Sequence, residues 1–143
     1  TTDAGALEKV RLIWEATGAE VVVMDSVLHD AILAAVSHLP HMIAYTLVNT
    51  VGDMEDSGVD ALGYSAGGFK DFTRIASSSP EMWSDICAMN KEQLLKTIDG
   101  FSARLARLRE LIEKEDLLAL KTEFERAKNL RDSLIKDDPK ERA

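Results

Sequence analysis

Cysteine, proline, glycine and aromatic residues are all scarce in this chain of 143 residues. Cys87 has no second cysteine with which to form a disulfide, and no cysteine–histidine spacing indicates a zinc site. With 3 prolines, 8 glycines and 6% aromatic residues, the chain lacks the turns that a sandwich or barrel of many strands requires. We therefore expect a helical, cytoplasmic protein that stays reduced and binds no metal.

Positive charge is also in short supply, because 17 lysines and arginines stand against 25 aspartates and glutamates, for a net charge of -8. A nucleic-acid-binding protein normally presents a basic face, so we expect no nucleic-acid partner. The first 12 residues lack the basic start and the apolar stretch of a signal peptide. Hydrophobic residues make up 45% of the chain, which is enough for the core of one domain.

The longest apolar run covers residues 31–48 and is nearly long enough to cross a bilayer. Its centre holds Ser37, His38, Pro40 and His41, and polar groups are costly in the middle of a membrane. No lysine or arginine flanks the run to set an orientation. We therefore predict a buried central helix and no membrane association.

Hydrophobic spacing and capping residues predict helices over most of the chain. Gly18 ends the first helix, and Asp25 or the serine after it caps the second, in which Pro40 should cause a kink. Ser79 and Pro80 begin a shorter helix. The predicted helices cover residues 5–17, 27–51, 81–89, 91–112 and 117–134, with turns at 52–63 and 113–116.

The β-branched run at residues 20–24 is the one convincing strand of the sequence. A single strand leaves its backbone groups unpaired, so we expect its sheet to lie elsewhere and the chain to be a piece of a larger protein. After residue 91, apolar residues recur at intervals of four and three, as in a long helix packed on another. The two C-terminal helices should form a hairpin, or supply an apolar surface for a second copy of the chain.

Two clusters have the residue types for chemistry. His38 and His41 are three residues apart and share a helix face, either as structural groups or as proton and hydrogen-bond partners. Arg74 follows a Gly-Gly pair and is suited to hold a carboxylate through two parallel hydrogen bonds, unless it pairs with Asp71 one turn away. The simplest interpretation of Trp83 is core packing. The chain contains no Gly-x-Gly-x-x-Gly motif and no catalytic triad order.

Several short blocks of residues make the sequence resemble the C-terminal part of the prephenate dehydrogenase family. Blocks that match in order carry the resemblance, which covers about residues 7–90, whereas the helices after residue 91 match in pattern only. The blocks are Leu12-Ile13-Trp14 with Thr17-Gly18-Ala19, His29-Asp30, Ser37-His38-Leu39-Pro40-His41, Gly67-Gly68-Phe69-Lys70-Asp71-Phe72-Thr73-Arg74-Ile75-Ala76, and Pro80-Glu81-Met82-Trp83-Ser84-Asp85-Ile86 with Asn90.

The resemblance implies an all-α fold, a helical dimerisation domain of the 6-phosphogluconate dehydrogenase C-terminal type. Residues 26–143 would form this homodimeric, substrate-binding domain, and residues 1–25 would be a helix–strand remnant of a Rossmann domain that binds NAD or NADP. The whole enzyme would oxidatively decarboxylate prephenate to 4-hydroxyphenylpyruvate in tyrosine biosynthesis, with tyrosine as a possible inhibitor. This chain lacks the dinucleotide fingerprint, so it should bind no cofactor and be inactive alone.

The resemblance also implies roles for individual residues. Arg74 corresponds to an arginine that holds a prephenate carboxylate, and His41 to a histidine of the substrate pocket. The remaining substrate-binding candidates are His38, Gly67, Asp71 and Trp83, the last near the dimer-related site. No catalytic residue is expected in this chain, since the histidine that assists hydride transfer would precede residue 1. Two alternatives stay open: an arogenate dehydrogenase domain, and a helical dimerisation module without enzymatic activity.

Overall fold

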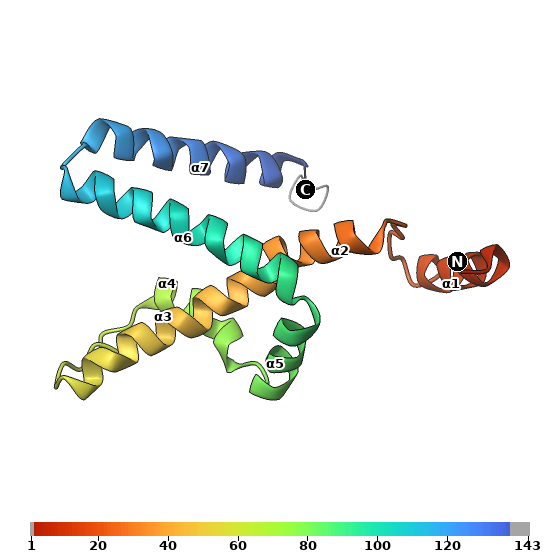
Figure 1. Cartoon of the computed structure of the whole chain (residues 1–143), viewed down its shortest axis with the longest axis horizontal. Coiled ribbons are helices and arrows are strands. Elements are labelled where there is room, and N and C mark those ends of the chain that lie inside the picture. Colours follow the sequence, from red (N-terminus) through yellow and green to blue (C-terminus); the bar gives the residue numbers. More distant parts are fainter. Residues whose placement is uncertain (1, 138–143) are drawn as a thin grey trace. The chain divides into compact units, whose positions relative to one another are not determined.

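The computed structural model describes residues 2–137, and every regular element within that range is helical (Figure 1). The all-α prediction is therefore confirmed. The chain divides into one compact unit that ends at Leu94 and a second that begins at Leu95. The elements are α1 (Ala4–Glu15), α2 (Ser26–Leu33), the π-helical η1 (Ala34–His38), α3 (Leu39–Asp56), α4 (Gly67–Thr73), the 3₁₀-helical η2 (Arg74–Ser77), α5 (Pro80–Met89), α6 (Lys91–Glu113) and α7 (Leu117–Asp137).

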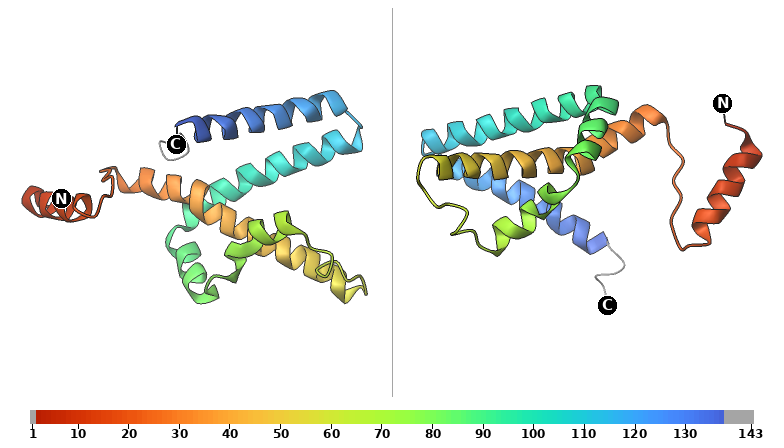
Figure 2. Two further views of the ribbon diagram at one scale, coloured as in Figure 1. Left: turned by 180° about the vertical axis from the view of Figure 1, so that it is seen from behind. Right: turned by 90° about the horizontal axis from the view of Figure 1, so that it is seen from below.

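The long apolar helix of the first unit consists of α2, η1 and α3, which follow one another without a loop (Figure 2). The carboxylate of Asp25 caps it, accepting the N–H of Val27 at 2.8 Å. Where a kink was predicted near Pro40, the helix instead has a π-helical turn just before it, in which the Leu39 N–H donates to the Ala34 carbonyl five residues back. Proline has no N–H to donate, so the regular ladder cannot run through this point.

The end of α3 was predicted too early, since the helix continues past Gly52 to Asp56. A single glycine inside a helix costs only about 1 kcal/mol and does not force an end. The helix stops where Gly58 adopts a left-handed φ of 83°, and the Val59 N–H donates to the Met54 carbonyl at 3.1 Å. The acidic turn region therefore begins after residue 56.

The segment made of α4 and η2 packs against α3. The hydroxyl of Tyr45 on α3 donates to the Ser78 carbonyl at 2.8 Å, which fixes the end of η2 to the long helix. The next helix, α5, begins as predicted: Ser79 caps it by accepting the Met82 N–H at 3.3 Å, and Pro80 occupies its first turn.

The strand predicted at residues 20–24 is not formed, because a strand exists only with a partner and the described residues supply none. The preceding helix ends as predicted, with Gly18 at a φ of 84°. Residues 2–20 are all exposed. This part of the chain therefore has no core of its own among the described residues.

In the second unit, α6 and α7 are joined at the predicted turn, where Glu115 has a φ of 53°. The predicted apolar seam of α6 should end at Ile112, and this is wrong: Ile112 is 62% exposed, whereas Leu111 is 2% exposed. At the turn that follows, the Asp116 N–H donates to the Leu111 carbonyl at 3.0 Å. Further along the hairpin, large apolar side chains remain exposed, namely Leu105, Leu117, Leu118, Phe124, Leu130 and Leu134.

Ser26–Met54 is long and apolar enough to cross a membrane by length and composition alone, a test that core helices also pass. Only 17% of its most apolar window is buried within one chain, so the burial predicted for this helix is not reached here. The absence of a membrane partner therefore stays a prediction.

Candidate functional site

Three aromatic rings meet beside the π-helical turn of the long helix. The imidazole of His41 stacks on the indole of Trp83, with ring centroids 3.7 Å apart and planes 24° apart. The ring of His38 approaches the same indole edge-on, at 6.0 Å and 78°. The structure thus confirms that His38 and His41 share a face, and places Trp83 on it within the same chain. Trp83 is 6% exposed, as its predicted core packing requires.

The backbone around Pro40 determines how His41 can hydrogen-bond. Its Nδ1 lies 2.9 Å from the Ser37 carbonyl oxygen, one helical turn back. A carbonyl oxygen only accepts, so Nδ1 of His41 carries a hydrogen. In the neutral ring Nε2 is then an acceptor, and it becomes a donor only when the ring is protonated.

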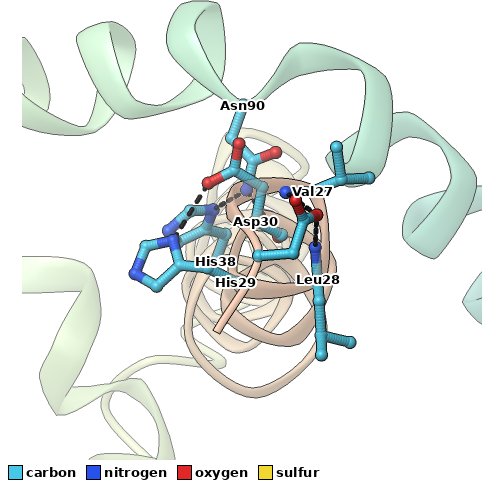
Figure 3. Close-up of polar contacts among 7 residues, drawn as sticks. Val27, Leu28, His29, Asp30, His38 and Asn90 are labelled. Carbon is cyan, nitrogen blue, oxygen red and sulfur yellow. Dashed lines mark hydrogen bonds and ion pairs between the residues drawn. The ribbon is translucent and has the colours of Figure 1, made fainter. Parts of the chain in front are cut away.

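His38 has a different partner, which the sequence did not identify. Nδ2 of Asn90, at the end of α5, lies 3.2 Å from Nδ1 of His38 and 2.8 Å from the Asp30 carbonyl oxygen (Figure 3). An asparagine just after a helix is usually interpreted as a cap, and no spacing pattern links it to a histidine 52 residues away. The contact exists only because α5 returns to the long helix.

Burial lowers the pKa of His38, whose side chain lies almost entirely out of solvent. The carboxylate of Asp30 acts in the opposite direction, while His41 and His29 add smaller effects that lower this pKa further. Burial therefore favours the neutral form of His38. The third histidine, His29, is exposed and pairs with the Asp30 carboxylate at 3.0 Å, outside the ring cluster.

Arg74 is the first residue of η2 and is exposed. The pairing with Asp71 that the spacing allowed is not formed, and no hydrogen bond or ion pair joins Arg74 to any other described residue. Gly67 is the first residue of α4 and Asp71 is the fifth, and both are exposed. Because α4 and η2 pack against α3, these candidates lie on the segment beside the helix that carries His41.

One buried donor in the cluster lacks an acceptor. The indole Nε1–H of Trp83 has no hydrogen-bond partner among the described residues. A buried N–H without a partner typically costs about 1–3 kcal/mol. Within residues 2–137, no group of three histidine, cysteine, aspartate or glutamate side chains is arranged to hold a metal ion.

A separate groove of about 310 Å³ lies in the second unit, between α6 and α7. Leu108, Phe124 and Leu130 contribute its apolar lining, and Arg104, Arg107 and Arg126 its positive charge. It contains none of the candidate site residues. Since Phe124 and Leu130 are also exposed, the groove is continuous with the uncovered apolar face of the hairpin.

The fold and the cluster define an all-helical domain. It has a polar site beside the π-helical turn of its longest helix, and an arginine on the adjoining segment that is unpaired among the described residues. The family model described as "Prephenate dehydrogenase, dimerization domain" matches residues 25–126. The chain belongs to this family, which confirms the resemblance found in the sequence.

Individual relatives agree with this assignment. The chain is 38% identical to a prephenate dehydrogenase of Bacillus subtilis and 39% identical to a cyclohexadienyl dehydrogenase of Zymomonas mobilis, over 93% and 95% of its length. These matches cover 36% and 47% of the two relatives, so the chain spans less than half of either.

Solved structures show the same relationship. The prephenate dehydrogenase of Aquifex aeolicus, in a complex with hydroxyphenyl propionate and NAD+, matches with a TM-score of 0.87 and 44% identity. That match covers 93% of this chain and 46% of the other. The arogenate dehydrogenase of Synechocystis matches with a TM-score of 0.78 and 25% identity, over 93% of this chain and 49% of the other.

Proposed function

We propose that this chain is the dimerisation and substrate-binding domain of an enzyme that oxidises and decarboxylates prephenate. The observation that carries the proposal is the family match over residues 25–126, which includes every candidate site residue. The relatives named as prephenate or cyclohexadienyl dehydrogenases support it.

The contribution of this chain is recognition of a dianionic substrate. The guanidinium of Arg74 has no internal partner among the described residues, so it is available to receive a carboxylate through two parallel hydrogen bonds. Neutral His41 offers only an acceptor at Nε2, which suits a hydroxyl group of the substrate. A substrate carboxylate only accepts, so it could bond to Nε2 of His41 only if the ring were protonated. His38, Gly67, Asp71 and Trp83 complete the proposed substrate site.

In the reaction, prephenate loses a hydride from the carbon that bears its hydroxyl group and loses its ring carboxylate as carbon dioxide. The products are 4-hydroxyphenylpyruvate, carbon dioxide and the reduced nicotinamide cofactor. The sequence has no dinucleotide fingerprint, which supports a cofactor site in another part of the longer protein. We place the cofactor and the group that assists hydride transfer outside these 143 residues, and expect the chain to be inactive alone.

Residues 1–25 are proposed to belong to that cofactor domain. The amphipathic α1 leaves Leu7, Ile13 and Trp14 exposed, and the β-branched run after it has no strand partner among the described residues. A sheet and helix layer of a Rossmann domain would cover both. Residues 26–143 form the helical domain in this proposal.

A second copy of the chain is the proposed partner of the uncovered apolar faces. The α6–α7 hairpin and the long helix both leave large apolar side chains in contact with solvent. Burying such surface is the main driving force of association, and a homodimer covers the same patch on both copies. We further propose a cytoplasmic location and inhibition by tyrosine, which shares its ring with the product.

Arogenate is the alternative substrate, because one structural relative is an arogenate dehydrogenase and one sequence relative a cyclohexadienyl dehydrogenase. The test uses the longer protein that contains this sequence, with prephenate or arogenate and with NAD+ or NADP+. Reduction of the cofactor is followed by absorbance. We expect turnover with prephenate. Turnover with arogenate alone would show that arogenate is the substrate. No turnover with either compound would overturn the proposed function.

A further inference from the structure

The amide of Asn90 lies between the backbone of α2 and the ring of His38 (Figure 3). Its Nδ2 is 2.8 Å from the Asp30 carbonyl oxygen and 3.2 Å from Nδ1 of His38. Asn90 and His38 are each 8% exposed, so both contacts are shielded from bulk water. In such surroundings a hydrogen-bonding group without a partner is costly, so the direction of each bond is strongly constrained.

The direction of these bonds follows from the donor and acceptor inventory. The Asp30 carbonyl oxygen can only accept, so the amide must face it with its NH₂ group. That group has two hydrogens, one for Asp30 and one for Nδ1 of His38. Nδ1 of His38 must then be the acceptor, and a neutral imidazole that accepts at Nδ1 carries its hydrogen on Nε2.

We propose that Asn90 is a positioning residue, which fixes His38 as the neutral tautomer with its hydrogen on Nε2. His41 is fixed in the opposite tautomer by the Ser37 carbonyl. The two rings of one helix face therefore have opposite polarity at Nε2, a donor on His38 and an acceptor on His41. That His38 belongs to a substrate site rests on the proposed function, whereas the tautomer itself does not.

The charged and titratable groups around His38 are compatible with a neutral ring. His29 and Asp30 lie on α2 and pair with each other, and His41 lies on α3. Burial lowers the pKa of His38, opposed by the Asp30 carboxylate and reinforced by the other two histidines. From α5 and its C-cap, the ring contacts the uncharged Trp83 and Asn90.

The test is a long-range ¹H–¹⁵N correlation spectrum of the ¹⁵N-labelled chain near neutral pH, which reports which imidazole nitrogen carries hydrogen. We expect His38 to be protonated at Nε2 and unprotonated at Nδ1, and His41 to show the reverse. A hydrogen on Nδ1 of His38, or comparable amounts of both tautomers, would overturn the proposal. This spectrum needs no variant, so it decides the matter even if a substitution prevents folding.

The Asn90→Asp substitution then tests the role of the amide. A carboxylate accepts instead of donating, so Nδ1 of His38 should carry a hydrogen and the pKa of His38 should rise. The matched control is Asn49→Asp, which adds the same charge at an exposed position of α3. Equal effects of the two substitutions on His38 would contradict the proposal.

This outcome is independent of the proposed function. If the longer protein fails to oxidise prephenate while His38 shows the expected tautomer, the enzymatic assignment falls and the role of Asn90 stands. If turnover is observed while His38 shows the other tautomer, the role of Asn90 falls and the assignment stands.

Discussion

The indole of Trp83 and the imidazole of His41 stack with their centroids 3.7 Å apart, across an interval of 42 residues in the sequence. This contact joins α5 to the long helix just after its π-helical turn. It is also the point at which a buried apolar surface meets the polar groups proposed to recognise the substrate. The contact therefore contributes both to the stability of the first unit and to the shape of its site.

Replacement of Trp83 should separate the packing of the ring from its hydrogen-bonding group. We expect Trp83→Ala to lower the free energy of unfolding by about 3–5 kcal/mol, since a large buried side chain is lost. Trp83→Phe should cost less than half as much, because it keeps a ring and removes a buried N–H that has no partner among the described residues. Urea unfolding followed by circular dichroism measures both.

The control for this pair is Trp14→Phe, because Trp14 is 58% exposed. It should change the free energy of unfolding by no more than about 0.5 kcal/mol. Equal effects of Trp83→Ala and Trp14→Phe would show that the ring cluster does not exist in solution.

The buried His38 predicts how stability depends on pH. Its pKa in the folded chain lies below the ordinary value of 6.5, so between these two values the unfolded chain binds a proton that the folded chain does not. The stabilisation is fully present above pH 6.5 and is lost as the pH falls through the folded pKa. We expect the pH dependence of urea midpoints in this window to be weaker in His38→Gln than in the wild type.

His29→Gln is the control for that experiment, because His29 is exposed. It removes the partner of Asp30 and a minor influence on the pKa of His38, so it should change the pH dependence less than His38→Gln does. A His38→Gln variant with an unchanged pH dependence would mean that His38 titrates alike in the folded and unfolded chains.

The uncovered apolar face of the hairpin predicts self-association. In sedimentation equilibrium, the chain should have about twice its monomer mass of 15.8 kDa. Phe124→Glu should weaken the dimer, because it would bury a carboxylate in an apolar interface. Lys121→Glu, at an exposed polar position of the same helix, should not. A wild-type chain that remains monomeric at high concentration would contradict this assignment of the hairpin.

Features determined by neighbouring residues were predictable from the sequence. The caps at Asp25 and Ser79, the stop at Gly18 and the irregularity before Pro40 all follow from side chains within a few positions. Features that depend on a partner far away in the sequence could not be predicted. The run at residues 20–24 has strand composition but no strand to pair with among the described residues, and the Asn90–His38 bond depends on how α5 returns to the long helix.

The candidate site shows the same division. Spacing placed His38 and His41 on one face, and the structure adds Trp83 to them. Spacing also offered Asp71 as a partner for Arg74, but the short helix gives way to a 3₁₀ turn at Arg74, and the pair is not formed among the described contacts. The consequence is an exposed cation next to the long helix, which is what a carboxylate-binding role requires.

Arg74 therefore provides the most direct test of the account as a whole. In the longer enzyme that contains this sequence, Arg74→Gln should raise the KM for prephenate by about 10- to 100-fold, the usual effect of losing a charge-assisted hydrogen bond to a carboxylate. Arg109→Gln, an exposed arginine of α6 that pairs only with Glu113 in the described structure, is the matched control and should leave KM unchanged. An unchanged KM for prephenate in Arg74→Gln would contradict the proposed substrate site.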